Sequence, residues 1–169
     1  MSKKTHVPLA GIVVGSKTDL GVMSEAISIL EEFGVPFEIR VISAHRTPDR
    51  AFEYGRSAKE RGLRLIIAAA GKSAHLPGVL SALTTLPVLG VPMETSDLGG
   101  LDSLLSIVQM PGGIPVGTTA IGKAGAKNAA LLAVAILALN DATLDSKLIE
   151  YRRRLAAQVE EDDRNLREE

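Results

Sequence analysis

Short apolar segments alternate along this chain with segments of helical periodicity, and this alternation limits the fold more than any other feature. We expect strands over residues 9–14, 37–42, 63–69, 87–91 and 116–121. Apolar residues at helical spacing separate them, as at residues 23–33 and 101–108. The alternation predicts a parallel, doubly wound sheet with helices on both faces. This is a three-layer α/β/α fold of flavodoxin-like or Rossmann-like type, here with a C-terminal helix.

The expected helix ends carry the residue types that start and stop helices. Gly34 follows the first helix and suits a left-handed position after its last turn. Thr47 and Pro48 suit the N-cap and first turn of the second helix, which we expect to stop near Gly62. A third helix is expected to begin near Pro77.

Two helices are expected beyond the last strand. Residues 129–139 are eleven consecutive apolar residues, which predicts a helix buried on all sides. The final helix carries one apolar stripe, and the polar residues 160–169 are expected to fray. With 169 residues and no linker, we expect one domain over residues 1–169. The stripe consists of Leu144, Leu148, Tyr151, Leu155 and Val159.

Charged residues are nearly absent between residues 66 and 122. This stretch holds four of them, together with nine of the sixteen glycines and five of the eight prolines. The prolines interrupt every window of about 20 residues that a membrane span would need. Such an uncharged third must be covered by packing, by a ligand or by other subunits, so we expect an oligomer rather than a monomer.

The rest of the composition excludes several functional classes. Twenty acidic and 19 basic residues give a net charge of −1, which argues against a nucleic-acid partner. There is no cysteine for a disulfide, a thiolate nucleophile or a cysteine–zinc site, and five aromatic residues make a flavin site hard to build. The N-terminal residues lack the apolar core of a signal peptide, so we expect a cytoplasmic protein without a membrane partner.

Ligands of doubly wound sheets bind beyond the carboxyl ends of the strands, which directs attention to three loops. The first begins at Gly15, where backbone amides at a helix start could hold an anion. Ser16 and Thr18 could add hydroxyl donors, and Asp19 could accept from sugar hydroxyls. The same residues could also serve only to cap the helix, and this loop alone leaves both interpretations open.

The second loop, residues 43–48, places His45 and Arg46 side by side at a helix N-terminus. Two cations beside the positive end of a helix dipole are unfavourable unless an anion binds there. Histidine titrates near neutrality and therefore suits proton transfer. We favour a functional role for this pair over two unrelated surface side chains.

The third loop, residues 71–78, contains a second histidine, His75, which we expect to share a pocket with His45. No Gly-x-Ser-x-Gly elbow marks a serine nucleophile, and two histidines without a carboxylate at ligand spacing make a weak metal site. The residues themselves thus predict proton transfer on a small, phosphorylated, sugar-containing substrate, with His45 as the acid/base.

The start of the third loop, Gly71-Lys72-Ser73, has the residues that end a Walker A loop. The glycine that this motif requires five residues earlier is replaced by Ile66, which lies within an expected strand. There is no room for a phosphate-wrapping loop, so we reject an NTPase.

Several motifs together resemble the PurE family over nearly the whole chain. The family comprises N5-carboxyaminoimidazole ribonucleotide mutases of de novo purine synthesis. The resemblance implies a cofactor-free rearrangement, in which a carbamate loses CO2 and the CO2 is recaptured on C4 of the imidazole. The motifs are GSKTD at 15–19, SAHRTP at 43–48, HLPG at 75–78, LPVLGVP at 86–92, DSLLSIVQMP at 102–111 and GKAGAKNAA at 122–130.

The resemblance also implies roles for individual residues and an assembly. His45 matches the general acid/base that moves the C4 proton. Ser16 and Asp19 would contact the ribose phosphate part, and Arg46 the phosphate. The implied partners are the ribonucleotide, CO2 and other copies of the chain, because the family forms homo-octamers with sites at subunit junctions. The base and CO2 pocket would be lined by Ser43, Ala44, Gly71, His75 and Leu76.

One loop departs from the mutase pattern. Bacterial mutases usually read AGAGGAAHLPG where residues 68–78 read AAAGKSAHLPG, so Lys72 adds a cation beside the implied CO2 site. Lys72 and Ser73, which we also expect to bind substrate, resemble a second class of the family that carboxylates aminoimidazole ribonucleotide directly with CO2. This direct carboxylase and a non-catalytic flavodoxin-like binding module are the alternatives to a mutase.

Overall fold

The computed structural model of the protein describes residues 7–168. The chain divides into two compact units, Met1–Ala133 and Val134–Glu169. A single domain over residues 1–169 therefore stays a prediction. Among the described residues, no helix combines the length and the apolar character that a membrane crossing requires.

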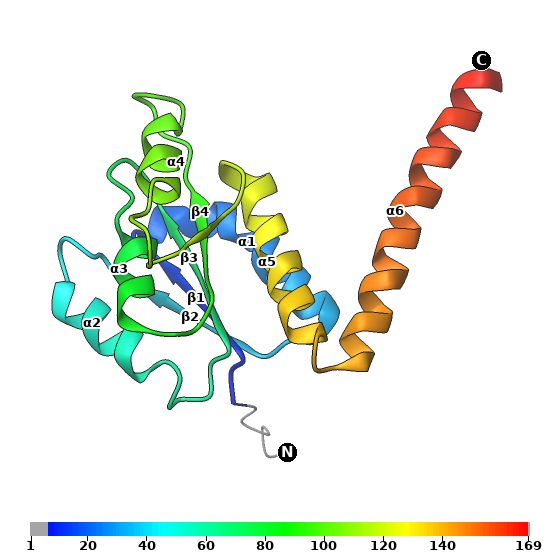
Figure 1. Ribbon diagram of the computed structural model, residues 1–169. Coiled ribbons are helices and arrows are strands. Elements are labelled where there is room, and N and C mark those ends of the chain that lie inside the picture. The colour runs from blue at the N-terminus through cyan, green and yellow to red at the C-terminus, as the bar shows by residue number, and fades with distance from the viewer. Residues whose placement is uncertain (1–6, 169) are drawn as a thin grey trace. The chain divides into compact units, whose positions relative to one another are not determined.

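The first unit is built on one parallel sheet of five strands in the order β2-β1-β3-β4-β5 (Figure 1). The first strand in sequence lies between two neighbours, and its Val14 is paired with Val41 on one side and with Ala69 on the other. This order confirms the predicted doubly wound, flavodoxin-like architecture. The strands are β1 (Ala10–Val14), β2 (Phe37–Val41), β3 (Leu65–Ala70), β4 (Val88–Pro92) and β5 (Gly117–Thr118).

The fifth strand is shorter than the expected span of residues 116–121. It pairs with β4 only over Gly117 and Thr118. The amide and the hydroxyl of Thr119 both donate to the Gly90 carbonyl of β4, at 3.0 and 3.2 Å, so the chain still follows β4 at this residue. The same hydroxyl lies 3.0 Å from the carbonyl oxygen of Gly125, which ties the end of the strand to the next helix.

Helices fill the connections between the strands. The end of the first long helix is as predicted, because Gly34 follows it with a left-handed φ of 73°. Thr47 occupies the N-cap position before Pro48, but its hydroxyl bonds to the backbone of Ser43 instead of to the amides of the helix. The helical elements are η1 (Lys17–Asp19), α1 (Leu20–Phe33), α2 (Pro48–Ser57), α3 (Leu76–Leu83), α4 (Leu101–Val108), α5 (Gly122–Ala138) and α6 (Ala142–Glu168).

Two apolar layers enclose the sheet, because side chains of a strand alternate between its faces. Helices α2 and α3 cover one face and α1 covers the other (Figure 1). On the first face, Val13 and Ile66 pack in one buried cluster with Leu80 of α3 and Ile107 of α4. All six residues of β3 are buried, as expected for the central strand of a doubly wound sheet.

The helices near the C-terminus differ from expectation in two ways. The apolar segment 129–139 was expected to be buried on all sides, but Leu132 is 43% exposed and Leu139 is 81% exposed within the single chain. The tail beyond residue 160 was expected to fray, but α6 is helical to Glu168. Glutamate, arginine and leucine favour helix there without tertiary support.

Candidate active site

A cavity of about 590 Å³ lies at the carboxyl ends of β1, β2, β3 and β4. Its wall combines glycine backbone, hydroxyl groups, both charge signs and two imidazoles, so it is built for a polar ligand. Eleven of the twelve residues that the sequence predicted for the site line it. They are Ser16, Asp19, Ser43, Ala44, His45, Arg46, Gly71, Lys72, Ser73, His75 and Leu76.

The loop after β1 is a tight turn held by its own side chains. The amide of Ser16 donates to the Asp19 carboxylate at 3.1 Å, and the amide of Thr18 donates to the Ser16 hydroxyl at 3.4 Å. This reciprocal capping fixes Asp19 at the cavity wall. Burial raises the pKa of the Asp19 carboxyl, although the bond from Ser16 acts in the opposite direction.

Thr18 is the predicted site residue that does not line the cavity. Its hydroxyl donates to the hydroxyl of Ser16 at 2.8 Å. Thr18 therefore contacts a residue of the wall without being part of it, and the N-cap of this turn is Ser16, which accepts from the Thr18 amide.

The loop after β2 holds its arginine against the first loop. The backbone amide of Arg46 donates to the Ser43 hydroxyl at 3.1 Å, and its guanidinium donates to the Gly15 carbonyl at 3.3 Å. No described carboxylate forms an ion pair with this guanidinium. Most of its donors remain available for an anion in the cavity.

His45 and His75 meet in the cavity although 30 residues separate them in sequence. Nε2 of His45 lies 2.8 Å from Nδ1 of His75, and the two rings meet edge to face at 83°. A hydrogen bond at this contact needs one of the two nitrogens to donate and the other to accept, and the tautomers of the rings decide which does which. The predicted common pocket of the two histidines is confirmed.

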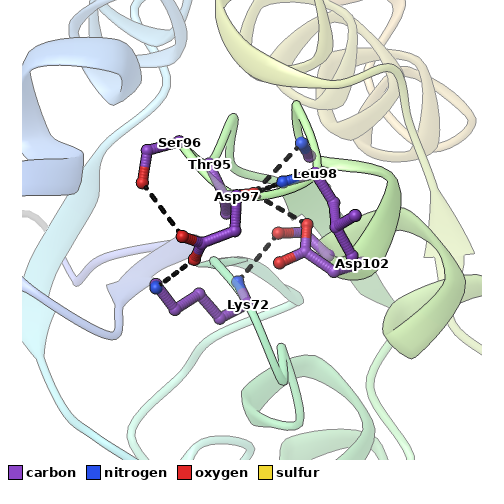
Figure 2. A network of polar contacts seen from close by, with 8 residues as sticks. Lys72, Thr95, Ser96, Asp97, Leu98 and Asp102 are labelled. Atoms are coloured by element: carbon purple, nitrogen blue, oxygen red, sulfur yellow. Dashed lines mark hydrogen bonds and ion pairs between the residues drawn. The ribbon is translucent and has the colours of Figure 1, made fainter.

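The loop after β3 passes through a conformation that side chains rarely adopt. Lys72 has φ = 58°, and it is the sole non-glycine residue among those described with a left-handed backbone. Its amide donates to the buried hydroxyl of Ser103 at 2.9 Å. Its ammonium forms an ion pair with Asp97 in the loop after β4 (Figure 2). Two neighbouring loops are thus joined across the edge of the sheet.

Four residues after β4 complete the wall and were missed by the sequence analysis. The fourth strand was predicted, and the sheet order places its carboxyl end beside that of β3. The rule that ligands bind at carboxyl ends could therefore have pointed to this loop as well. The four residues are Met93, Glu94, Thr95 and Ser96.

The loop after β4 has internal order. The Thr95 hydroxyl donates to Asp102 at 2.8 Å and accepts from the amide of Gly100 at 3.2 Å (Figure 2). Within residues 7–168, no three histidine, aspartate or glutamate side chains gather as a metal ion would require. The cavity is thus lined by the Arg46 guanidinium, by two imidazoles in contact with each other and by the Lys72 side chain.

Comparison with known proteins decides the family. The family model described as AIR carboxylase matches residues 9–158. The chain belongs to this family. Curated family members named N5-carboxyaminoimidazole ribonucleotide mutase include those of Pyrococcus horikoshii, 56% identical over 99% of this chain and 94% of the relative, and Bacillus subtilis, 59% identical over 86% and 90%.

A solved structure of the family supports the same assignment. The crystal structure of Treponema denticola PurE superimposes with a TM-score of 0.84 and 30% sequence identity, over 94% of this chain and 98% of that one. The Escherichia coli relative, also named as the mutase, is 54% identical over 90% of each chain. The predicted family resemblance is confirmed.

Proposed function

We propose that the protein is an N5-carboxyaminoimidazole ribonucleotide mutase of purine biosynthesis. The observation that carries the proposal is the His45–His75 pair, which lies in one cavity with the anion-seeking Arg46. Curated relatives that carry this name are 54–59% identical to the chain over most of its length. The proposed transfer of a carboxyl group and a proton requires no cofactor.

The reaction relocates one carboxyl group and one proton. The carbamate C–N bond breaks, CO2 leaves, and the exocyclic nitrogen regains a proton. The imidazole C4 then attacks CO2, a C–C bond forms, and the C4 proton leaves. His45 carries this proton, because an imidazole accepts and returns protons near neutral pH. His75 holds the ring of His45 in one orientation through the 2.8 Å contact.

The remaining residues bind and orient the ribonucleotide. Arg46 and the backbone of the first loop receive the phosphate, since a guanidinium and a helix start both favour an oxyanion. Ser16 and Asp19 contact the ribose phosphate part. The loop after β3 covers the base and the CO2 with Gly71, Ser73 and Leu76, and Ser43 and Ala44 complete the pocket.

Replacement of Arg46 by alanine is expected to raise the Michaelis constant for the ribonucleotide about 10- to 100-fold, with a smaller change in turnover. The loss corresponds to a charged hydrogen bond worth roughly 1.5–3 kcal/mol. Steady-state kinetics measures it, with Arg46→Lys as the matched control that keeps the charge but not the fork. An unchanged Michaelis constant in the alanine variant would exclude the phosphate role.

A two-substrate assay tests the reaction itself. Direct carboxylation of aminoimidazole ribonucleotide is the second candidate, and it is favoured by Lys72-Ser73 in the third loop. The enzyme is supplied either with the carbamate or with aminoimidazole ribonucleotide plus bicarbonate. We expect rapid conversion of the carbamate only. Rapid turnover of the second mixture alone would replace the mutase by the carboxylase, and no turnover of either would leave a binding module.

We also propose that the enzyme works as a homo-oligomer, an octamer as in the family, in the cytoplasm. Leu155 and Val159 support an assembly, because these apolar side chains are 51% and 68% exposed on α6 of the single chain. Leu132 adds a third exposed apolar residue on α5. Light scattering coupled to size-exclusion chromatography measures the mass of the assembly, and a monomer at micromolar concentration would contradict the proposal.

A further inference from the structure

Lys72 occupies a backbone position that is costly for any residue except glycine. Its φ of 58° lies in the left-handed region, where the side chain crowds the backbone. The fold maintains this conformation from both sides. Buried Ser103 accepts from the amide of Lys72 at 2.9 Å, and the Ser106 hydroxyl lies 3.4 Å from its carbonyl oxygen. Strain held in this way is characteristic of functional sites.

The side chain at this position carries a charge that the structure holds at the mouth of the cavity. The Lys72 ammonium pairs with Asp97, and their side chains are 68% and 58% exposed. An exposed ion pair contributes little to stability, so it does not account for a strained lysine. Lys72 lines the cavity whereas Asp97 does not. The ammonium can therefore leave Asp97 for a ligand without a large cost.

The sheet order separates this cation from the other one. Arg46 and the first loop follow β2 and β1, whereas Lys72 and Asp97 follow β3 and β4. Since the order is β2-β1-β3-β4, strand β1 lies between the two strands that precede these cations, so Arg46 and Lys72 enter the shared cavity from strand ends that are not neighbours. A ligand whose phosphate binds at Arg46 would present its other end to Lys72, and the two histidines lie in the same cavity.

We propose that Lys72 recognises the carboxylate that the reaction moves. Asp97 is the counter-ion of the Lys72 ammonium in the free protein, and the carboxylate of the ligand replaces it. This inference rests on the proposed function and deepens it. The two ribonucleotides that share the phosphate differ in this one group. Lys72 thus sets the preference of the cavity for the carboxylated ribonucleotide over aminoimidazole ribonucleotide.

Isothermal titration calorimetry with two ligands tests the assignment. One ligand is 4-carboxy-5-aminoimidazole ribonucleotide, and the other is aminoimidazole ribonucleotide. In Lys72→Met, which keeps the length and backbone demand of lysine but not its charge, the first should bind about tenfold more weakly. The second should change by less than about twofold. In Asp97→Asn the carboxylated ligand should bind more tightly, by up to about fivefold.

Other outcomes of the titrations would contradict the proposal or limit it. An equal loss for both ligands in Lys72→Met would assign the lysine to the phosphate or to structure, and overturn the proposal. No change for either ligand would overturn it as well. Lys72→Gly removes both the charge and the backbone strain. If this variant no longer discriminates between the two ribonucleotides but is at least as thermally stable as the wild type, the lost discrimination comes from recognition and not from misfolding. If the wild type turns over normally and the variants bind both ligands with unchanged affinity, only the role proposed for Lys72 is rejected. A wild type that binds neither ligand would reject both this role and the proposed function.

Discussion

Replacement of His45 by asparagine is expected to lower mutase turnover by about 10²- to 10⁴-fold, the range typical for loss of a positioned acid/base. Asparagine is polar and similar in size, so it can still bond to His75, but it cannot carry a proton at neutral pH. The rate of carbamate conversion at saturating substrate measures the effect. Full turnover in this variant would remove His45 from the proton-transfer step.

Two controls separate chemistry from structure. Binding of the carboxylated ribonucleotide by His45→Asn should stay within about threefold of the wild type, because the phosphate and carboxylate contacts remain. His75→Asn keeps the imidazole at position 45 and removes only its partner across the 2.8 Å contact. Its loss of turnover should therefore be smaller, and an equal loss in the two variants would show that the proton transfer needs both imidazoles and not His45 alone.

Replacement of Gly125 by alanine is expected to destabilise the fold by about 3 kcal/mol or more. An added Cβ would lie 1.6 Å from the carbonyl oxygen of Ala120, which is backbone and cannot rotate away. The same contact region holds the Thr119 hydroxyl against the Gly125 carbonyl at 3.0 Å. The turn from β5 into α5 would have to move as a whole. Denaturant unfolding at fixed protein concentration measures the change.

Gly21 provides the matched control for this substitution. It also lies in a helix, but no atom comes within 4 Å of a Cβ placed there. Alanine at position 21 should therefore stabilise the fold by about 0.5–1 kcal/mol, because it favours the helix. If Gly125→Ala unfolded at the wild-type midpoint, the close approach of α5 to Ala120 would not exist in solution.

Local patterns were sufficient for most elements of the sheet and helices. Gly34 stops α1 with a left-handed φ, and Pro48 starts α2, because these two residues restrict the backbone through their own covalent geometry. The burial of α5 and the end of α6 were predicted less well. Leu132 is 43% exposed although its helix is apolar, since sequence composition does not say which face another surface covers.

The candidate site was predictable at positions where the type of side chain by itself indicates a chemical role. His45 and His75 were expected in one pocket because both follow strands of a parallel sheet, and the structure brings them within 2.8 Å. Thr18 lies outside the cavity wall because its hydroxyl bonds to Ser16 within the turn, and sequence alone does not show which local partner a hydroxyl takes. Glu94 and its neighbours were missed because their loop has no motif of its own.

The sequence by itself determined the layered α/β/α class, the loops after three strands and the family, because periodicity and contiguous motifs are local properties of the chain. Only the tertiary structure decided that the loop after β4 closes the cavity and that Lys72 pairs with Asp97. Twenty-five positions separate these two residues in sequence. Their contact arises because parallel strands β3 and β4 end side by side at the same edge of the sheet.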